Sequence, residues 1–123
     1  MADYRESGDA PLRVLFCIGV TQQFFDETPE TLPLRIDAIK AAFSDLSGRF
    51  GVTVLGTMDD DELMVGSSTV FPWTAYILAD APSLGAVAAV CNVVRESPVG
   101  SDRLWKYLLI QARVGRALFF GND

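Results

Sequence analysis

Two kinds of hydrophobic spacing alternate along the chain. Four segments are rich in β-branched and aromatic residues, which is typical of β-strands. They are residues 13–20 (RVLFCIGV), 51–58 (GVTVLGTM), 72–80 (PWTAYILAD) and 103–116 (RLWKYLLIQARVGR). Residues 34–50 and 83–96 instead place apolar side chains three or four positions apart, which predicts two amphipathic helices.

The order strand, helix, strand, strand, helix, strand is that of the ferredoxin-like α+β fold, written βαββαβ. In this fold four antiparallel strands form one sheet, and both helices cover the same face of it. A chain of 123 residues fits a single domain. We therefore expect a mobile N-terminal arm at residues 1–11 and one ferredoxin-like domain at residues 12–123.

The segments between these elements are polar. Residues 21–33 (TQQFFDETPETLP) read as a loop, and residues 97–102 as a turn. The acidic run of residues 59–62 is expected to form a solvated hairpin tip, from which residues 63–66 return as a short arm. A metal loop is the alternative for the acidic run, but its spacing does not match a calcium-binding loop. We predict no metal site there.

The first and last predicted strands are apolar on both faces. Val14 and Phe16 alternate with Leu15 and Cys17, and residues 103–116 show large side chains in both alternating sets. Two helices can cover only one face of the sheet, so a monomer would expose the other face as a large apolar patch. Packing of two sheets face to face would cover that patch, which predicts a homodimer.

Composition excludes several classes of function. The net charge of −6 disfavours nucleic acids and anionic membrane surfaces as partners. No apolar run approaches the roughly 18 residues of a membrane span. The polar N-terminus lacks the apolar core of a secretory signal, and the two cysteines are far apart, so we expect a cytoplasmic protein with reduced thiols. The chain has no histidine, which removes the commonest general base and most zinc sites.

The chain resembles the dimeric α+β barrel superfamily over roughly residues 12–119. That superfamily includes muconolactone isomerases and antibiotic-biosynthesis-type monooxygenases that work without a cofactor. Four segments also look like a small accessory protein of bacterial indole-3-acetate catabolic operons: VLFCIGVTQQFF, VLGTMDDDELMVG, PWTAYILAD and LWKYLLIQARVGRALF. The resemblance implies a small aromatic or lactone-type ligand held between sheet and helices. Some related isomerases and monooxygenases use histidine in catalysis. This chain has no histidine, so those catalytic residues have no counterpart in it.

The last predicted strand offers the best candidate site. If residues 103–116 alternate regularly, Trp105, Tyr107, Gln111 and Arg113 share one face. Arg113 would bind a substrate carboxylate, Gln111 would orient it, Trp105 would stack on its ring and Tyr107 would donate a proton or hydrogen bond. The alternative is that Arg113 pairs with an acid across a subunit interface or meets solvent. An error of one residue in register would move all four side chains to the opposite face.

Other residues complete the candidate list. Tyr76 and Cys17 are expected to contribute to the pocket lining, with ordinary packing as the alternative for both. Neither Cys17 nor Cys91 has the electropositive setting of a nucleophile. Asp61 or Glu62 is the candidate if an acid acts as a base. The glycines match neither a P-loop nor a dinucleotide-binding pattern, so we expect no nucleotide cofactor.

Three functions remain open from the sequence. The first is an isomerase or cofactor-free monooxygenase acting on a small aromatic acid or lactone. The second is a non-catalytic protein that binds such a compound in the same pocket. The third is a structural module whose apolar sheet face serves only dimerisation.

Overall fold

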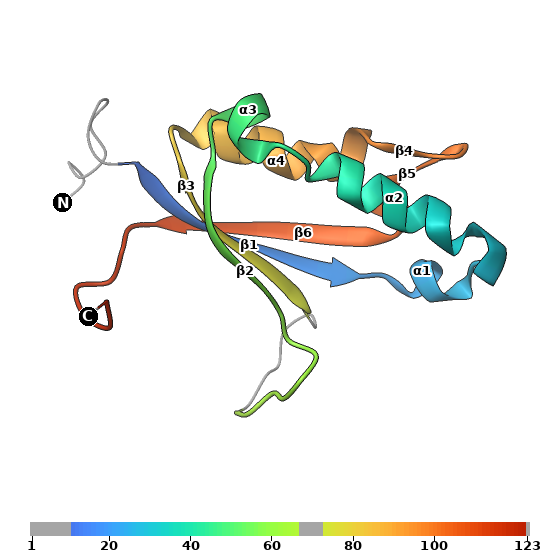
Figure 1. Cartoon of the computed structure of the whole chain (residues 1–123), viewed down its shortest axis with the longest axis horizontal. Helices are drawn as coiled ribbons and strands as arrows, with labels where there is room; N and C mark the ends of the chain where they lie inside the picture. Colours follow the sequence, from blue (N-terminus) through green and yellow to red (C-terminus); the bar gives the residue numbers. More distant parts are fainter. Residues whose placement is uncertain (1–10, 67–72, 123) are drawn as a thin grey trace.

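The computed structural model describes residues 11–66 and 73–122. Four long strands form one sheet: β1 (Leu12–Val20), β2 (Thr53–Asp59), β3 (Ala75–Ala81) and β6 (Leu108–Gly115). The strand order is β2-β3-β1-β6, and every neighbouring pair is antiparallel (Figure 1). This is the order of the ferredoxin-like α+β fold, so the predicted fold class is confirmed.

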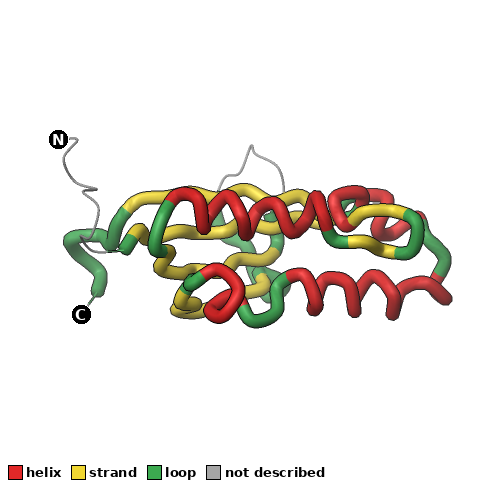
Figure 2. The backbone as a smooth tube through the Cα atoms, turned by 90° about the horizontal axis from the view of Figure 1, so that it is seen from above, coloured by secondary structure: helices red, strands yellow, loops and turns green. Residues whose placement is uncertain are grey.

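Three helices lie along one face of the sheet: α2 (Leu32–Ala42), α3 (Leu46–Phe50) and α4 (Leu84–Glu96) (Figure 1). The two long ones, α2 and α4, run along the sheet (Figure 2). Short elements join these parts: α1 (Gln22–Asp26), the 3-10 turns η2 (Pro29–Thr31) and η3 (Leu104–Lys106), and a small hairpin of β4 (Pro98–Val99) and β5 (Asp102–Arg103).

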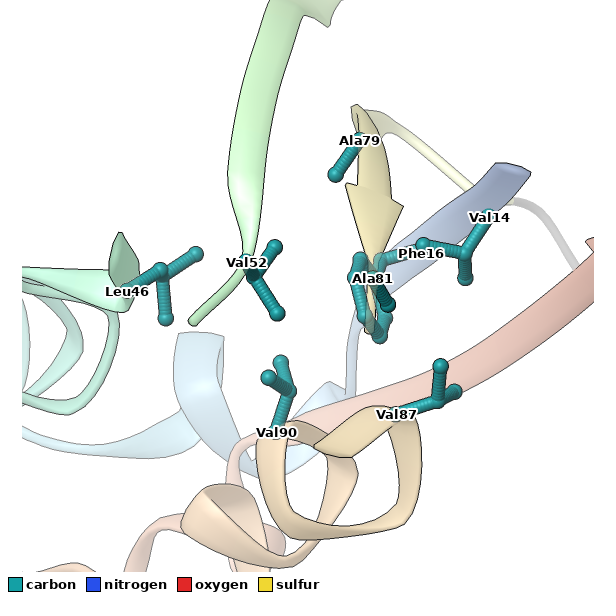
Figure 3. Packing of buried hydrophobic residues seen from close by; sticks show 8 residues of the cluster. All are labelled: Val14, Phe16, Leu46, Val52, Ala79, Ala81, Val87 and Val90. Atoms are coloured by element: carbon teal, nitrogen blue, oxygen red, sulfur yellow. The ribbon is translucent and has the colours of Figure 1, made fainter. Parts of the chain in front are cut away.

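The core lies between the sheet and the helices. Val14 and Phe16 of β1 are fully buried, and they pack with Val87 and Val90 of α4 (Figure 3). Small side chains on β3, Ala79 and Ala81, let the helix approach the sheet closely. A second cluster of buried residues fills the other end of the same layer, around Leu104, Tyr107 and Leu108. The strand residues among them occupy the alternate positions that face the helices.

The register of strand pairing determines which side chains lie on the opposite face of the sheet. None of the three helices covers that face. Leu15 of β1 lies between Leu78 of β3 and Arg113 of β6. The next residue on that face, Cys17, lies between Tyr76 and Gln111. We call this the open face of the sheet.

The predicted helix over residues 34–50 is wrong as one element, because the chain breaks it into α2 and α3. Asp45 takes a left-handed backbone conformation (φ 48°, ψ 50°), which ends the run of helical residues. Its carboxylate caps α3 by accepting a hydrogen bond from the Gly48 N–H at 3.1 Å. Arg49 Nη1 donates to the carbonyl oxygens of Ala42 and Ser44, at 2.9 and 2.8 Å, and so satisfies the end of α2.

Other expectations also change. The predicted loop of residues 21–33 contains α1, η2 and the start of α2. Residues 63–66 form no strand, so the returning hairpin arm is wrong for these residues. The third strand begins at Ala75, and Pro72 lies outside the described residues, as do residues 1–10 of the predicted N-terminal arm. The last strand begins at Leu108, five residues later than predicted.

Candidate functional site

An open groove of about 630 Å³ lies on the open face of the sheet. Its floor is formed by β1, β2 and β3, and the segment after β2 forms a wall. The lining side chains are mainly apolar, with one phenol and one carboxylate among them. The lining residues are Leu15, Gly56, Thr57, Met58, Asp60, Leu63, Met64, Val65, Tyr76 and Leu78. A concave, apolar surface with few polar groups is typical of a small-molecule site.

The polar feature of this groove is a hydrogen bond between Tyr76 and Asp60. The Tyr76 hydroxyl donates to Asp60 Oδ2 at 3.0 Å and also lies 3.1 Å from the carbonyl oxygen of Trp73. Burial raises the pKa of the Tyr76 phenol, and the hydrogen bond to Asp60 and its negative charge raise it further. Tyr76 therefore stays protonated and can serve as a hydrogen-bond donor. The acid that lies against it is Asp60, whereas Asp61 and Glu62, the candidates named from the sequence, are not among the residues that line the groove.

Asp60→Asn is expected to lower the pKa of Tyr76, because it removes the negative charge that favours the neutral phenol. A raised pKa in the folded state means that the unfolded protein loses this proton first as the pH rises. The contribution of Tyr76 to stability is thus complete below about pH 10 and is lost as the pH rises toward its folded pKa. Titration of tyrosinate absorbance would measure the change. Asp61→Asn is the matched control and should leave the titration as it is in the wild type.

Arg113 and Gln111 form a second polar group on the open face. With its carboxamide oxygen toward Arg113, Gln111 accepts hydrogen bonds from Arg113 Nε at 2.9 Å and Nη2 at 3.0 Å. Arg113 is opposite Leu15, which lines the groove, so its Cα lies about one strand spacing, roughly 5 Å, from the groove floor. The structure therefore brings the predicted pair to the border of the groove.

Cys17 lies between the two polar groups and is buried. It shares the open face with Tyr76 and Gln111, but it is buried and is not among the residues that line the groove. Cys91 lies on α4 against the core, where burial raises the pKa of its thiol. A raised pKa disfavours the reactive thiolate, so Cys91 is a poor nucleophile.

Trp105 and Tyr107 are not on the face that carries Gln111 and Arg113, so this part of the predicted site is wrong. Trp105 belongs to the 3-10 turn η3, is 55% exposed and lies under the guanidinium of Arg95, 5.5 Å from its ring centre. Tyr107 precedes β6 and is buried on the helix side of the sheet. The strand alternation does not extend back to these residues because a turn begins at Leu104.

Tyr107 belongs to a separate polar cluster at the end of the sheet. Its hydroxyl donates to Glu27 Oε1 at 3.2 Å and lies 3.5 Å from Asp102 Oδ2. Lys106 Nζ is 3.2 Å from Asp102 and 3.8 Å from Glu27. Burial raises the pKa of Tyr107, with the charge of Glu27 as the next cause. Tyr107 can act as a donor here, but it cannot reach a ligand bound on the open face.

Sequence reasoning missed Met58, Met64 and Asp60 in the groove, and Arg35 beside Tyr107. The acidic run did point to the segment after β2, but spacing alone did not show which acid turns toward β3. In the described part of the chain, no group of three or more histidine, cysteine, aspartate or glutamate residues is placed to hold a metal ion. Within the same residues, no helix has the length and apolar character needed to cross a bilayer.

No protein-family model and no curated protein matches the sequence. Among solved structures, the chain is similar to one described as "Crystal structure of Putative Chlorite dismutase TA0507", with a TM-score of 0.50 and 15% sequence identity. The alignment covers 87% of this chain and 43% of that chain, so this chain spans less than half the length of the structure it matches. At this identity the likeness concerns the fold alone, which is of the ferredoxin-like type.

Proposed function

We propose that the protein binds a small aromatic or lactone-type carboxylate in the groove on the open face of its sheet. The observation that carries this proposal is the combination of an apolar groove of about 630 Å³ with the Tyr76–Asp60 pair in its lining and the Gln111–Arg113 pair at its border. An apolar ring fits the groove, and an anionic group fits the guanidinium of Arg113 at its border.

The two polar pairs have different roles in this proposal. Arg113 presents several N–H donors in one plane, which suits the two oxygens of a carboxylate. Gln111 accepts from that guanidinium and so holds its orientation. Cα atoms of Tyr76 and Gln111 are about 10 Å apart, two strand spacings, which leaves room for one ring between the two pairs.

The Tyr76–Asp60 pair also offers chemistry that needs no histidine. In an isomerase, Asp60 would take a proton from the carbon next to a lactone carbonyl, and the Tyr76 hydroxyl would donate to the enolate oxygen that forms. Asp60 would then return the proton to another carbon. A protein that only binds the compound would use the same groove without this step.

The homodimer remains part of the proposal. The open face carries large apolar side chains, and further exposed apolar residues follow β6 at the end of the chain. These residues are Leu15, Met58, Leu78 and Leu109 on the sheet, and Leu118, Phe119 and Phe120 after it. A second copy packed on this face would shield them and enclose the groove, which would exclude water from the ligand.

Arg113→Ala is expected to reduce stabilisation of the protein by aromatic acids and muconolactones in a thermal-shift screen, because it removes the carboxylate-binding group of the open-face groove. A ligand at a hundredfold excess over its dissociation constant stabilises the wild type by about 2.7 kcal/mol, which appears as a shift of a few degrees. The variant should keep its melting temperature without ligand, since Arg113 is exposed.

Arg103→Ala, at an exposed position in β5, is the control and should respond to ligand like the wild type. Stabilisation that is as large in Arg113→Ala as in the wild type would contradict the proposed role of Arg113. No response of the folded wild type to any compound would favour a structural dimerisation module.

A further inference from the structure

Arg35 is the one buried charged side chain in the described part of the chain. It is the fourth residue of α2, and only 3% of its surface is exposed. Charged side chains are almost never fully buried unless they are paired. The burial of Arg35 is therefore unusual, and its position on α2 does not explain it.

The guanidinium has few polar partners. Nη1 donates to Thr31 Oγ1 at 2.5 Å, whereas Nε has no hydrogen-bond partner among the described residues. The central carbon of the Arg35 guanidinium, Cζ, lies 5.0 Å from the ring centre of Phe24 and 5.7 Å from that of Tyr107. Two aromatic rings thus lie against the cation, and an N–H group in the guanidinium plane is left unused.

No acid in the described ranges forms an ion pair with Arg35. Glu27 and Asp102, the acids of the neighbouring cluster, contact the Tyr107 hydroxyl and the Lys106 ammonium group instead. The aromatic rings attract the cation, but they cannot accept the hydrogen bond that Nε offers. A buried cation without a counter-ion and with an unsatisfied donor destabilises the free protein.

The segment over this cluster is attached by polar contacts and by one ring, that of Phe24, which packs against Tyr107. We call residues 21–31, which contain α1 and η2, the strap. Neither α1 nor η2 has a buried residue, and α1 lies beyond the end of β1 (Figure 1). Thr21 holds the strap at one end, since its Oγ1 donates to the Lys106 carbonyl at 2.6 Å and its N–H to the Tyr107 carbonyl at 2.9 Å. Segments with few buried apolar contacts open locally at low cost.

We infer that Arg35 anchors a second carboxylate-binding site, which the strap conceals and which opens when the strap moves. The carboxylate would approach in the plane of the guanidinium and accept the free Nε–H, because the aromatic rings lie over its faces. Tyr107 would then contact a planar ligand, and Phe24, which belongs to the strap, would contact it when the strap closes again. A monocarboxylate fits better than phosphate, because Glu27 and Asp102 are close enough to repel a doubly charged ion.

This site is independent of the open-face groove. The Arg35 cluster belongs to the layer between sheet and helices, since Tyr107 packs with residues of α2 and α4. The groove lies on the other face of the sheet. Failure of one site therefore leaves the other untouched.

The test measures binding of benzoate by the wild type, Arg35→Met and Arg113→Ala, with benzamide as the uncharged compound and inorganic phosphate as the other anion. Titration calorimetry would give the affinities, and hydrogen exchange would report on the strap. We expect benzoate to bind Arg113→Ala as well as the wild type at this site, and not to bind there in Arg35→Met. Benzamide and phosphate should bind the site at least roughly tenfold more weakly than benzoate. Amide exchange within residues 21–31 should change when benzoate binds.

Arg35→Met should melt at the same temperature as the ligand-free wild type or higher, because it removes an unpaired buried cation. Arg35→Lys is the second variant, in case Arg35→Met does not fold. It keeps the positive charge but lacks the planar donor group, so benzoate should bind it at least roughly tenfold more weakly than the wild type. Benzoate affinity unchanged in the folded Arg35 variants would overturn the inference. So would a wild type whose strap exchange is the same with and without benzoate.

Discussion

Phe16→Ala is expected to destabilise the protein by about 3–5 kcal/mol, a large part of the roughly 5–15 kcal/mol that a domain of this kind has in total. Phe16 is fully buried in the layer between the sheet and α4, where its ring is the largest side chain with no exposed surface. Truncation removes apolar contacts and leaves a cavity, because the neighbouring small residues Ala79 and Ala81 cannot fill the space. The midpoint of urea unfolding, at an unchanged slope, would measure the loss.

Leu15→Ala is the matched control for this change. Leu15 is the neighbouring residue on the same strand, but its side chain stands on the open face and is only partly buried. Its truncation should destabilise the folded monomer by less than Phe16→Ala does. Equal losses in the two variants, measured at concentrations where the protein is monomeric, would show that the two faces of β1 are buried alike and would contradict the assignment of the helix-facing side.

Leu78→Glu is expected to dissociate the proposed homodimer while leaving the monomer folded. Leu78 is 39% exposed on the open face, so a carboxylate there remains hydrated in the monomer. In a dimer packed through this face, two copies of the charge would be buried. A cost of roughly 2 kcal/mol for each copy would raise the dissociation constant about a thousandfold. Sedimentation across a range of protein concentrations would show the shift from dimer to monomer.

Leu84→Glu provides the comparison, since Leu84 is an exposed residue at the start of α4 on the opposite side of the sheet. It should leave the dimer intact. Circular dichroism would establish that both variants are folded. A wild type that is monomeric at micromolar concentration, or a dimer that Leu78→Glu does not weaken, would show that the open face is not the interface.

The shared face of Gln111 and Arg113 could be predicted because both residues lie within β6, where side chains alternate regularly. Trp105 and Tyr107 were placed with them by extending the same alternation backward. That extension fails because the Leu104 N–H bonds to the Ser97 carbonyl and the Tyr107 N–H to the Leu104 carbonyl, so the chain turns before the strand begins. The hydrogen bond to Ser97 joins two segments, and no local pattern in residues 103–107 shows it.

The residues around each site came together through contacts distant in sequence. Tyr76, Cys17 and Gln111 are neighbours only because β1 pairs with both β3 and β6 in one particular register. Asp60 was hidden in a run of four acids, and its contact with Tyr76 depends on how the chain leaves β2. Arg35 is a polar residue within a predicted amphipathic helix, and its contacts with the strap and with Tyr107 bury it.

Hydrophobic spacing alone predicted the number and order of the main strands and the location of the two helical regions, because it reflects which side of each element faces the core. It also indicated that the sheet has a second apolar face, since β1 carries Leu15 and Cys17 at the positions that alternate with Val14 and Phe16. Contacts between distant parts of the chain set which polar groups meet, where the helix over residues 34–50 breaks and which tyrosine faces the groove. These outcomes depend on register, on turns and on single hydrogen bonds between distant segments, and such interactions leave no periodic signal in the chain.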